Sequence, residues 1–229
     1  MSALHLVRHG QAAFGESDYD RLTSIGTEQC VQLARHWAAL ERAVPLVFTG
    51  TVRRQTGSAE AFVTTLGEIL GNAPGITVIE GLEEYDHVAL LRSYAARIHR
   101  QADLAALNGD RRAFHKFIER ALECWARGEL PDLEPFSEFR DRCVAALDRL
   151  MRQVGRGRTA VVFGSAGSLA AAIQPIIGLG DRDLLRLKLN FHNTGITKVL
   201  FNDDAAVIES INAIPHLEQP GLSHLVSQR

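Results

Sequence analysis

The sequence has little of what marks a secreted, membrane-spanning or nucleic-acid-binding protein. Its three cysteines are an odd number without CxxC spacing, which argues against a disulfide framework and fits a reducing cytoplasm. The 25 basic and 27 acidic residues leave a formal net charge of -2, so no global positive field attracts nucleic acid or an anionic membrane. No apolar run approaches the ~20 residues of a membrane helix, and no signal-peptide pattern is seen. We expect a cytoplasmic protein without nucleic-acid or membrane partners, and homodimer formation is left open.

Several site motifs are also missing. The sequence contains no GxxxxGK[ST] loop, no HExxH and no paired CxxC, so neither a P-loop nor a zinc site is expected. The Gly-Ser-Ala-Gly of residues 164–167 is one residue short of the G-x-S-x-G nucleophile elbow. We therefore expect no metal and no cofactor, and any anion must be bound by a few well-placed cations.

Apolar patterning predicts one α/β domain spanning residues 1–229. The chain is 46% hydrophobic, enough for a sizeable core. Strands are expected over residues 4–7, 46–48, 76–79, 159–163, 196–201 and 206–211, and helices near 24–40, 59–70 and 166–177. Alternating strands and helices predict a mainly parallel central sheet with helices on both faces. The turn at Asn202-Asp203-Asp204 predicts an antiparallel strand among the last ones.

The segment from about 88 to 135 departs from this alternation. It is rich in arginine and helical in pattern, with interruptions at Asn108-Gly109 and between Pro131 and Pro135. We interpret it as a helical cap insertion that leads into a core helix ending near residue 153.

Polar side chains cluster where the predicted strands end. In an open α/β sheet, ligands bind beyond the carboxyl ends of the strands. The residues at these ends are Arg8, His9, Gly10 and Gln11 after the first strand, Arg53 and Arg54 after the second, Glu83, Glu84 and His87 after the third, and Ser165, Ala166 and Gly167 after the fourth. Guanidinium groups suit an oxyanion with several oxygens. Spacing alone leaves open whether His9 is catalytic or belongs to an ordinary polar loop.

The stretch Leu-Val-Arg-His-Gly-Gln at residues 6–11 resembles the signature of the histidine phosphatase superfamily, the phosphoglycerate mutase-like family. The resemblance continues in order along the chain. It includes Leu-Thr-x-x-Gly-x-x-Gln at 22–29, the strand and loop at 47–54, Ala-Glu at 59–60, Leu-Glu-Glu at 82–84, and Asn193. Residues 88–150 show no specific match, as expected where members of the family differ in their cap.

The resemblance implies roles for the clustered residues. His9 would accept the phosphoryl group, Arg8 and Arg54 would bind its oxygens, and Glu84 would act as the general acid and base without a metal. Arg53 replaces Arg54 if the loop is one residue shorter, and Glu83 is the alternative to Glu84. Gln11 is a further candidate for the site.

One position departs from the family pattern. The fourth strand of the family ends in Val-x-His-Gly-Gly, and here Ser165 stands at that second histidine. We expect Ser165 to face the phosphate pocket, with the backbone amides of Ala166 and Gly167 at a helix N-terminus. A serine brings no charge, and loss of one placed donor costs ~10²–10³ in rate in comparable oxyanion sites. His87 is a candidate for the missing cation.

These observations predict a metal-independent phosphoric monoester hydrolase of the histidine acid phosphatase type, acting on a small phosphorylated substrate. A non-catalytic phosphate-binding or regulatory module is the alternative, because of Ser165. A phosphomutase is less favoured, because Ala-Ala-Phe-Gly at 12–15 does not resemble the Ser-x-Trp-Asn of the mutases.

Overall fold

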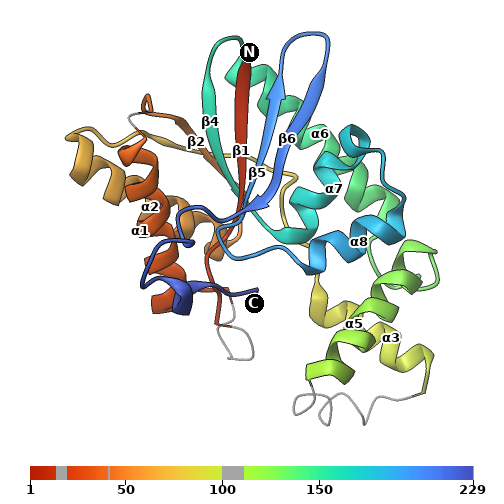
Figure 1. The fold of residues 1–229 in the computed structure, drawn as a ribbon. Coiled ribbons are helices and arrows are strands. Elements are labelled where there is room, and N and C mark those ends of the chain that lie inside the picture. Colours follow the sequence, from red (N-terminus) through yellow and green to blue (C-terminus); the bar gives the residue numbers. More distant parts are fainter. Residues whose placement is uncertain (14–19, 41, 100–110, 229) are drawn as a thin grey trace.

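A computed structural model describes residues 1–13, 20–40, 42–99 and 111–228 (Figure 1). Phe14, Gly15 and the expected Asn108-Gly109 interruption lie outside these residues. The described chain contains one six-stranded sheet in the order β3-β2-β4-β1-β5-β6. Its strands are β1 (Ser2–Arg8), β2 (Leu46–Thr49), β3 (Ile76–Val78), β4 (Thr159–Gly164), β5 (Ile196–Phe201) and β6 (Ala206–Ala213). The first four strands are parallel and β5 is antiparallel to both of its neighbours, which confirms the mainly parallel sheet and the late antiparallel strand.

Helices cover both faces of the sheet, as expected. Helices α1 (Ser24–Ala39) and α2 (Arg53–Leu70) pack on one face, and α6 (Phe136–Val154) and α7 (Ala166–Ile177) pack on the other (Figure 1). The central strand β4 shows why. Val161 and Phe163 join the core under α1 and α2, whereas Ala160 and Val162 join the core under α6 and α7. Side chains alternate between the faces with period two, and every one of these residues is apolar.

Helix α2 begins earlier than the apolar pattern predicts, at Arg53 instead of near Ala59. The reason is a tertiary cap. The Asp20 carboxylate accepts hydrogen bonds from the backbone N–H of Arg53 (2.9 Å) and of Arg54 (3.3 Å). A carboxylate satisfies two of the free N–H groups and interacts favourably with the positive end of the helix dipole. Both arginines therefore belong to the first turn of α2.

The cap segment is helical, as expected, in its described residues. Helices α3 (His87–Arg97) and α5 (Arg111–Ala126) pack together away from the sheet, beside α8 (Asp181–Leu189) (Figure 1). Helix α8 is an element that the sequence pattern did not predict. Arg182 and Arg186 join α8 to α5 through ion pairs with Glu123 and Glu119. A short 3-10 helix, Ser223–Leu225, completes the described elements, none of whose helices is long and apolar enough to cross a membrane.

The loop after β1 is pressed against the first turn of α1 at two glycines. A Cβ on Gly26 would lie 2.2 Å from the Gln11 carbonyl oxygen, and one on Gly10 would lie 2.4 Å from the Gly26 carbonyl oxygen. Backbone atoms on both sides leave no flexible group to move away. This close approach holds the residues that follow β1 in place.

We expect Gly26→Ala to lower the free energy of unfolding by about 2 kcal/mol or more, because a backbone overlap forces two elements apart. Gly57→Ala in the interior of α2 is the matched control. A Cβ there would meet only Leu22 at 3.7 Å, so the better helix propensity of alanine should stabilise the protein by roughly 0.5–1 kcal/mol. Urea unfolding measures whether each substitution lowers or raises the free energy of unfolding. A Gly26→Ala variant more stable than the wild type would contradict the close approach.

Candidate active site at the carboxyl edge of the sheet

His9 lies immediately beyond β1, with its backbone bound from two sides. Its N–H donates to the Gly164 carbonyl (2.8 Å), and its carbonyl accepts from Asn193 Nδ2 (3.2 Å). The residue is 3% exposed. Nδ1 lies 2.7 Å from the Gly10 carbonyl oxygen, and because a carbonyl only accepts, the proton belongs on Nδ1. That tautomer leaves a lone pair on Nε2.

Arg54, and not Arg53, lies against His9. The Arg54 side chain is buried, and its Nε donates to His9 Nε2 at 3.2 Å. Asp20 Oδ1 binds Arg54 Nη1 at 2.8 Å and so sets the direction of the guanidinium. Arg53 is exposed in the same helical turn. Adjacent helical residues point about 100° apart, so only one of the two arginines can face the imidazole.

Arg8 supplies a second guanidinium near His9 from the end of β1. It donates to the carbonyl of Phe191, just after α8. Burial lowers the pKa of His9 well below 6.5, and the charges of Arg8 and Arg54 lower it further. His9 is therefore a neutral imidazole at pH 7.

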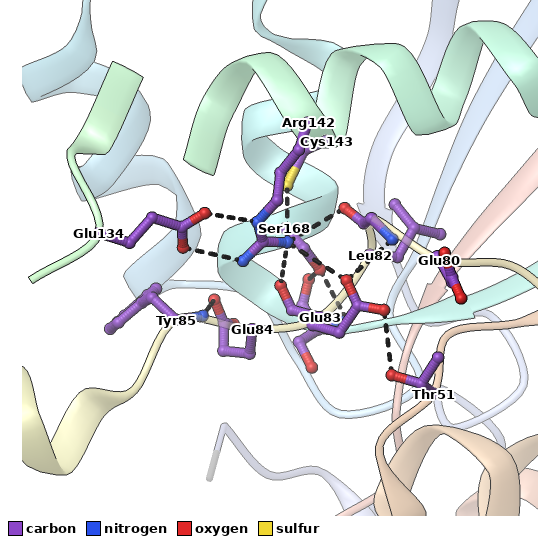
Figure 2. A network of polar contacts seen from close by, with 12 residues as sticks. Thr51, Glu80, Leu82, Glu83, Glu84, Tyr85, Glu134, Arg142, Cys143 and Ser168 are labelled. Atoms are coloured by element: carbon purple, nitrogen blue, oxygen red, sulfur yellow. Dashed lines mark hydrogen bonds and ion pairs between the residues drawn. The ribbon is translucent and has the colours of Figure 1, made fainter. Parts of the chain in front are cut away.

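Glu84 and Glu83 occupy different surroundings (Figure 2). Glu84 Oε2 accepts from the Gly167 N–H at 2.8 Å, at the start of α7. Glu83 instead accepts from Thr51 Oγ1 at 3.0 Å and lies 3.5 Å from Arg142 Nη1. The Arg142 guanidinium is in turn held by Glu134, with 2.7 Å between Arg142 Nε and Glu134 Oε1. Glu83 thus belongs to a network that fastens this loop to α6, whereas Glu84 lies at the helix N-terminus.

The amide of Gly167, expected to contact phosphate, is occupied by the Glu84 carboxylate in this structure. The positive end of a helix attracts any nearby anion, and Glu84 is close enough to take the place. A Cβ at Gly167 would lie 2.2 Å from Glu84 Oε1. Glycine is therefore required for the carboxylate to approach the helix.

Ser165 is fully buried at the end of β4. Its Oγ accepts a hydrogen bond from Gln55 Nε2 at 2.8 Å, and the same amide donates to the Leu82 carbonyl at 3.0 Å. Ala166, the next residue, is buried as well. Ser165 thus lies at the expected edge with its hydroxyl tied to α2, and its contact with an anion stays a prediction.

Two further groups come near the site. His87 begins α3, and burial together with the Arg54 charge lowers its pKa, while Asp86 and Glu84 oppose the shift. Lys188, in the last turn of α8, is 8% exposed. Burial lowers the Lys188 pKa to about 8, against the attraction of Glu84. At pH 7 Lys188 therefore carries a charge that His87 lacks.

The loop after β1 is held by further side chains, some of which were not singled out from the sequence. Gln11 turns its side chain to Thr23, whose Oγ1 lies 3.0 Å from Gln11 Oε1. Ser58 Oγ accepts from the Gly10 N–H at 3.0 Å. The residues not singled out from the sequence are Asp20, Gln55, Ser58 and Lys188. Gln55 and Ser58 could have been recognised from the sequence, since polar residues three apart on the buried face of an apolar helix need hydrogen-bond partners.

Within the described residues, no three His, Cys, Asp or Glu side chains are placed to hold a metal ion.

Solved structures of other proteins superimpose on this chain over most of its length. The phosphoserine phosphatase of Entamoeba histolytica, solved with 3-phosphoglyceric acid, superimposes with a TM-score of 0.65 at 18% identity, over 95% of this chain and 100% of that one. The α-ribazole phosphatase of Shigella flexneri gives 0.61 at 16% identity, over 93% and 96% of the two chains. A mycobacterial glucosyl-3-phosphoglycerate phosphatase gives 0.60 at 19% identity, over 92% and 98%. These similarities establish the fold.

No curated protein matches this sequence. A family model does match, and its match runs from residue 4 to residue 214, from β1 through the end of β6. It includes every strand-end residue described above. The chain therefore belongs to the histidine phosphatase superfamily, branch 1.

Proposed function

We propose that the protein is a phosphatase that hydrolyses a small phosphate monoester through a phosphohistidine on His9. The observation that carries this proposal is the state of the His9 imidazole. Its Nδ1 is tied to the Gly10 carbonyl, and its Nε2 faces Arg54. A neutral ring, oriented through one nitrogen with a lone pair on the other, is what nucleophilic attack on phosphorus requires.

The proposed reaction has two steps. The Arg54 guanidinium turns from His9 Nε2 to the phosphoryl oxygens as the substrate enters. The freed Nε2 lone pair then attacks phosphorus, the ester P–O bond breaks, and Glu84 gives its proton to the departing alkoxide. Glu84 then takes a proton from a water molecule that attacks the phosphohistidine, and the N–P bond breaks to release phosphate. Arg8 and Arg54 bind the phosphoryl oxygens and neutralise the charge that divalent metal handles in P-loop enzymes. The proposal therefore needs no metal.

Structural similarity supports a small substrate. The proteins compared above are named as phosphatases of phosphoserine, α-ribazole phosphate and glucosyl-3-phosphoglycerate. All three fold like this chain over nearly their whole length. We propose that the cap helices α3 and α5 select the substrate, because this segment carries no family motif.

The three cysteines are free and buried, which supports a reducing compartment.

A phosphate-binding module is the second candidate, and Ser165 favours it. The residue brings no charge to the position of the second histidine, and its Oγ is held by Gln55. Such a protein would bind phosphate at Arg8 and Arg54 without turning over esters.

The central test is turnover of p-nitrophenyl phosphate in the presence of EDTA. We expect activity from the wild type, and an acid-labile, base-stable phosphoryl label on the protein. His9→Ala should abolish both, because it removes the imidazole nitrogen proposed to accept the phosphoryl group. His224→Ala, which removes an exposed histidine, should change neither. Label that persists in His9→Ala would overturn the phosphohistidine, and activity that requires added Mg²⁺ would overturn metal independence.

Glu84→Gln and Glu83→Gln separate the acid from its neighbour. Glu84→Gln should lower kcat by about 10²-fold or more, since general acid catalysis contributes 10²–10⁴. The loss should be larger for an alkyl phosphate than for p-nitrophenyl phosphate, whose leaving group needs less protonation. Glu83→Gln should keep kcat and lower the unfolding midpoint, because it removes the charge that faces Arg142 and replaces one acceptor oxygen with a donor. The reverse pattern would assign the proton transfer to Glu83.

The pKa of His9 should respond to Arg54 and not to Arg53. In the wild type, an NMR titration should find the His9 pKa well below 6.5, since burial and two positive charges oppose protonation. Removing a nearby cation raises the pKa of a histidine, so Arg54→Ala should shift it upward. Arg53→Ala should leave it where it is. An upward shift in Arg53→Ala alone would show that the wrong arginine had been placed at the site.

A further inference from the structure

Lys188 differs from the other lysines of the chain. The sequence contains three, at positions 116, 188 and 198, and among them only Lys188 is buried. Its Nζ donates to the Tyr85 hydroxyl and lies 4.6 Å from the centre of the Tyr85 ring. A buried ammonium group is costly unless an anion compensates it.

The position of Lys188 connects it to the site. Tyr85 directly follows Glu84, and Phe191, whose carbonyl accepts from Arg8, lies three residues after Lys188. The charges of Glu84 and Arg8 both act on Lys188, and Lys188 in turn acts on His87. Lys188 thus contacts the segment that carries the proposed acid, and its own segment contacts Arg8, one of the arginines proposed to bind phosphate.

The surroundings of Lys188 leave its charge only partly compensated. Within the described residues, the one hydrogen-bond acceptor of Nζ is the Tyr85 hydroxyl, and no carboxylate lies within ion-pair distance, 4.0 Å, of it. Glu84 attracts it from farther away while its own Oε2 binds the Gly167 N–H. An ammonium group has three N–H donors, and a neutral hydroxyl cannot cancel the charge. This arrangement suits a cation that pairs with an anionic ligand.

We propose that Lys188 binds the phosphoryl group of the substrate and supplies the positive charge that Ser165 does not bring to the position of the second histidine. This inference rests on the proposed function of the same site. Tyr85 is a positioning residue, because its ring and hydroxyl hold the ammonium group. The charge reaches the site from α8, on the side of Arg8, instead of from the end of β4.

Binding of inorganic phosphate to the full chain, measured by calorimetry, tests the proposal. Lys188→Met should weaken phosphate binding at pH 7 by about tenfold or more, a change of ~1.4 kcal/mol. Lys188→Arg should retain part of the affinity. Lys198→Met is the matched control, because Lys198 pairs with Glu209 in the hairpin of β5 and β6, and it should bind phosphate as the wild type does. Unchanged affinity in Lys188→Met would overturn the proposal.

Stability separates binding from a structural role. Lys188→Met removes a buried charge and keeps an apolar side chain of similar length, so the free energy of unfolding should not fall. A lysine that only fastened Tyr85 would show lower stability in Lys188→Met with phosphate affinity intact, and that outcome also contradicts the proposal.

The pH dependence gives a second test that does not need Lys188→Met to fold. The Lys188 pKa is about 8, so the ammonium group loses its proton as the pH rises through that value. Phosphate affinity of the wild type and of Lys198→Met should fall between about pH 7 and about pH 9.5, whereas Lys188→Arg stays charged and should not show this loss. The other groups that face Lys188 are Glu84, Arg8, Tyr85 and His87. The same decline in Lys188→Arg would show that a group other than Lys188 titrates in this range, and it would contradict the proposal.

Turnover measurements keep this inference apart from the phosphatase proposal. If the wild type binds phosphate through Lys188 but hydrolyses no ester, the phosphatase proposal fails and the role of Lys188 stands. If His9-dependent turnover is present and Lys188→Met is unaffected in kcat/KM and in phosphate affinity, only the role of Lys188 fails.

Discussion

The contact between Arg54 Nε and His9 Nε2 holds a neutral imidazole against a permanent positive charge, and much of the surrounding structure serves to maintain it. A protonated His9 would be repelled by Arg54, so burial and charge act in the same direction. Asp20 anchors the guanidinium at Nη1 and also caps the helix that carries it. One carboxylate therefore fixes both the start of α2 and the direction of Arg54.

The second constraint is the close packing of the loop after β1. Gly10 and Gly26 allow their backbones to approach within a distance that no Cβ would tolerate. Ser58 then binds the Gly10 N–H, and its own hydroxyl donates to the Arg54 carbonyl at 2.7 Å. The nucleophile loop and the arginine helix thus share one hydrogen-bonded bridge, so a displacement of either would change the geometry at His9.

The opposite side of the site depends on a helix N-terminus. Glu84 occupies the amide of Gly167, and Glu83 ties the same loop to Arg142 of α6. Two adjacent carboxylates therefore have separate tasks, because one points at α7 and the other at α6 (Figure 2). Ser165 is tied to Gln55 on this side. Arg8 binds the Phe191 carbonyl just after α8, and Lys188 in the last turn of α8 binds the Tyr85 hydroxyl. Both of the cations proposed to bind phosphate here therefore meet the segment around the end of α8.

The local sequence pattern determines the strands, the helices and the ends of most of these elements. Short apolar runs such as residues 159–163, alternating along the chain with segments of helical spacing, were enough to predict the mainly parallel sheet, its two helical layers and the strand ends where His9 and Glu84 lie. Whether Arg53 or Arg54 faces His9 was left open, because a shift of one residue changes no local preference. That choice depends on Asp20, 33 residues before Arg53 in the chain. Lys188 carried no signal either, since its partner Tyr85 lies 103 residues away. Local sequence preferences decide elements and their ends, whereas the partners of buried charges come from distant segments that only the tertiary structure brings together.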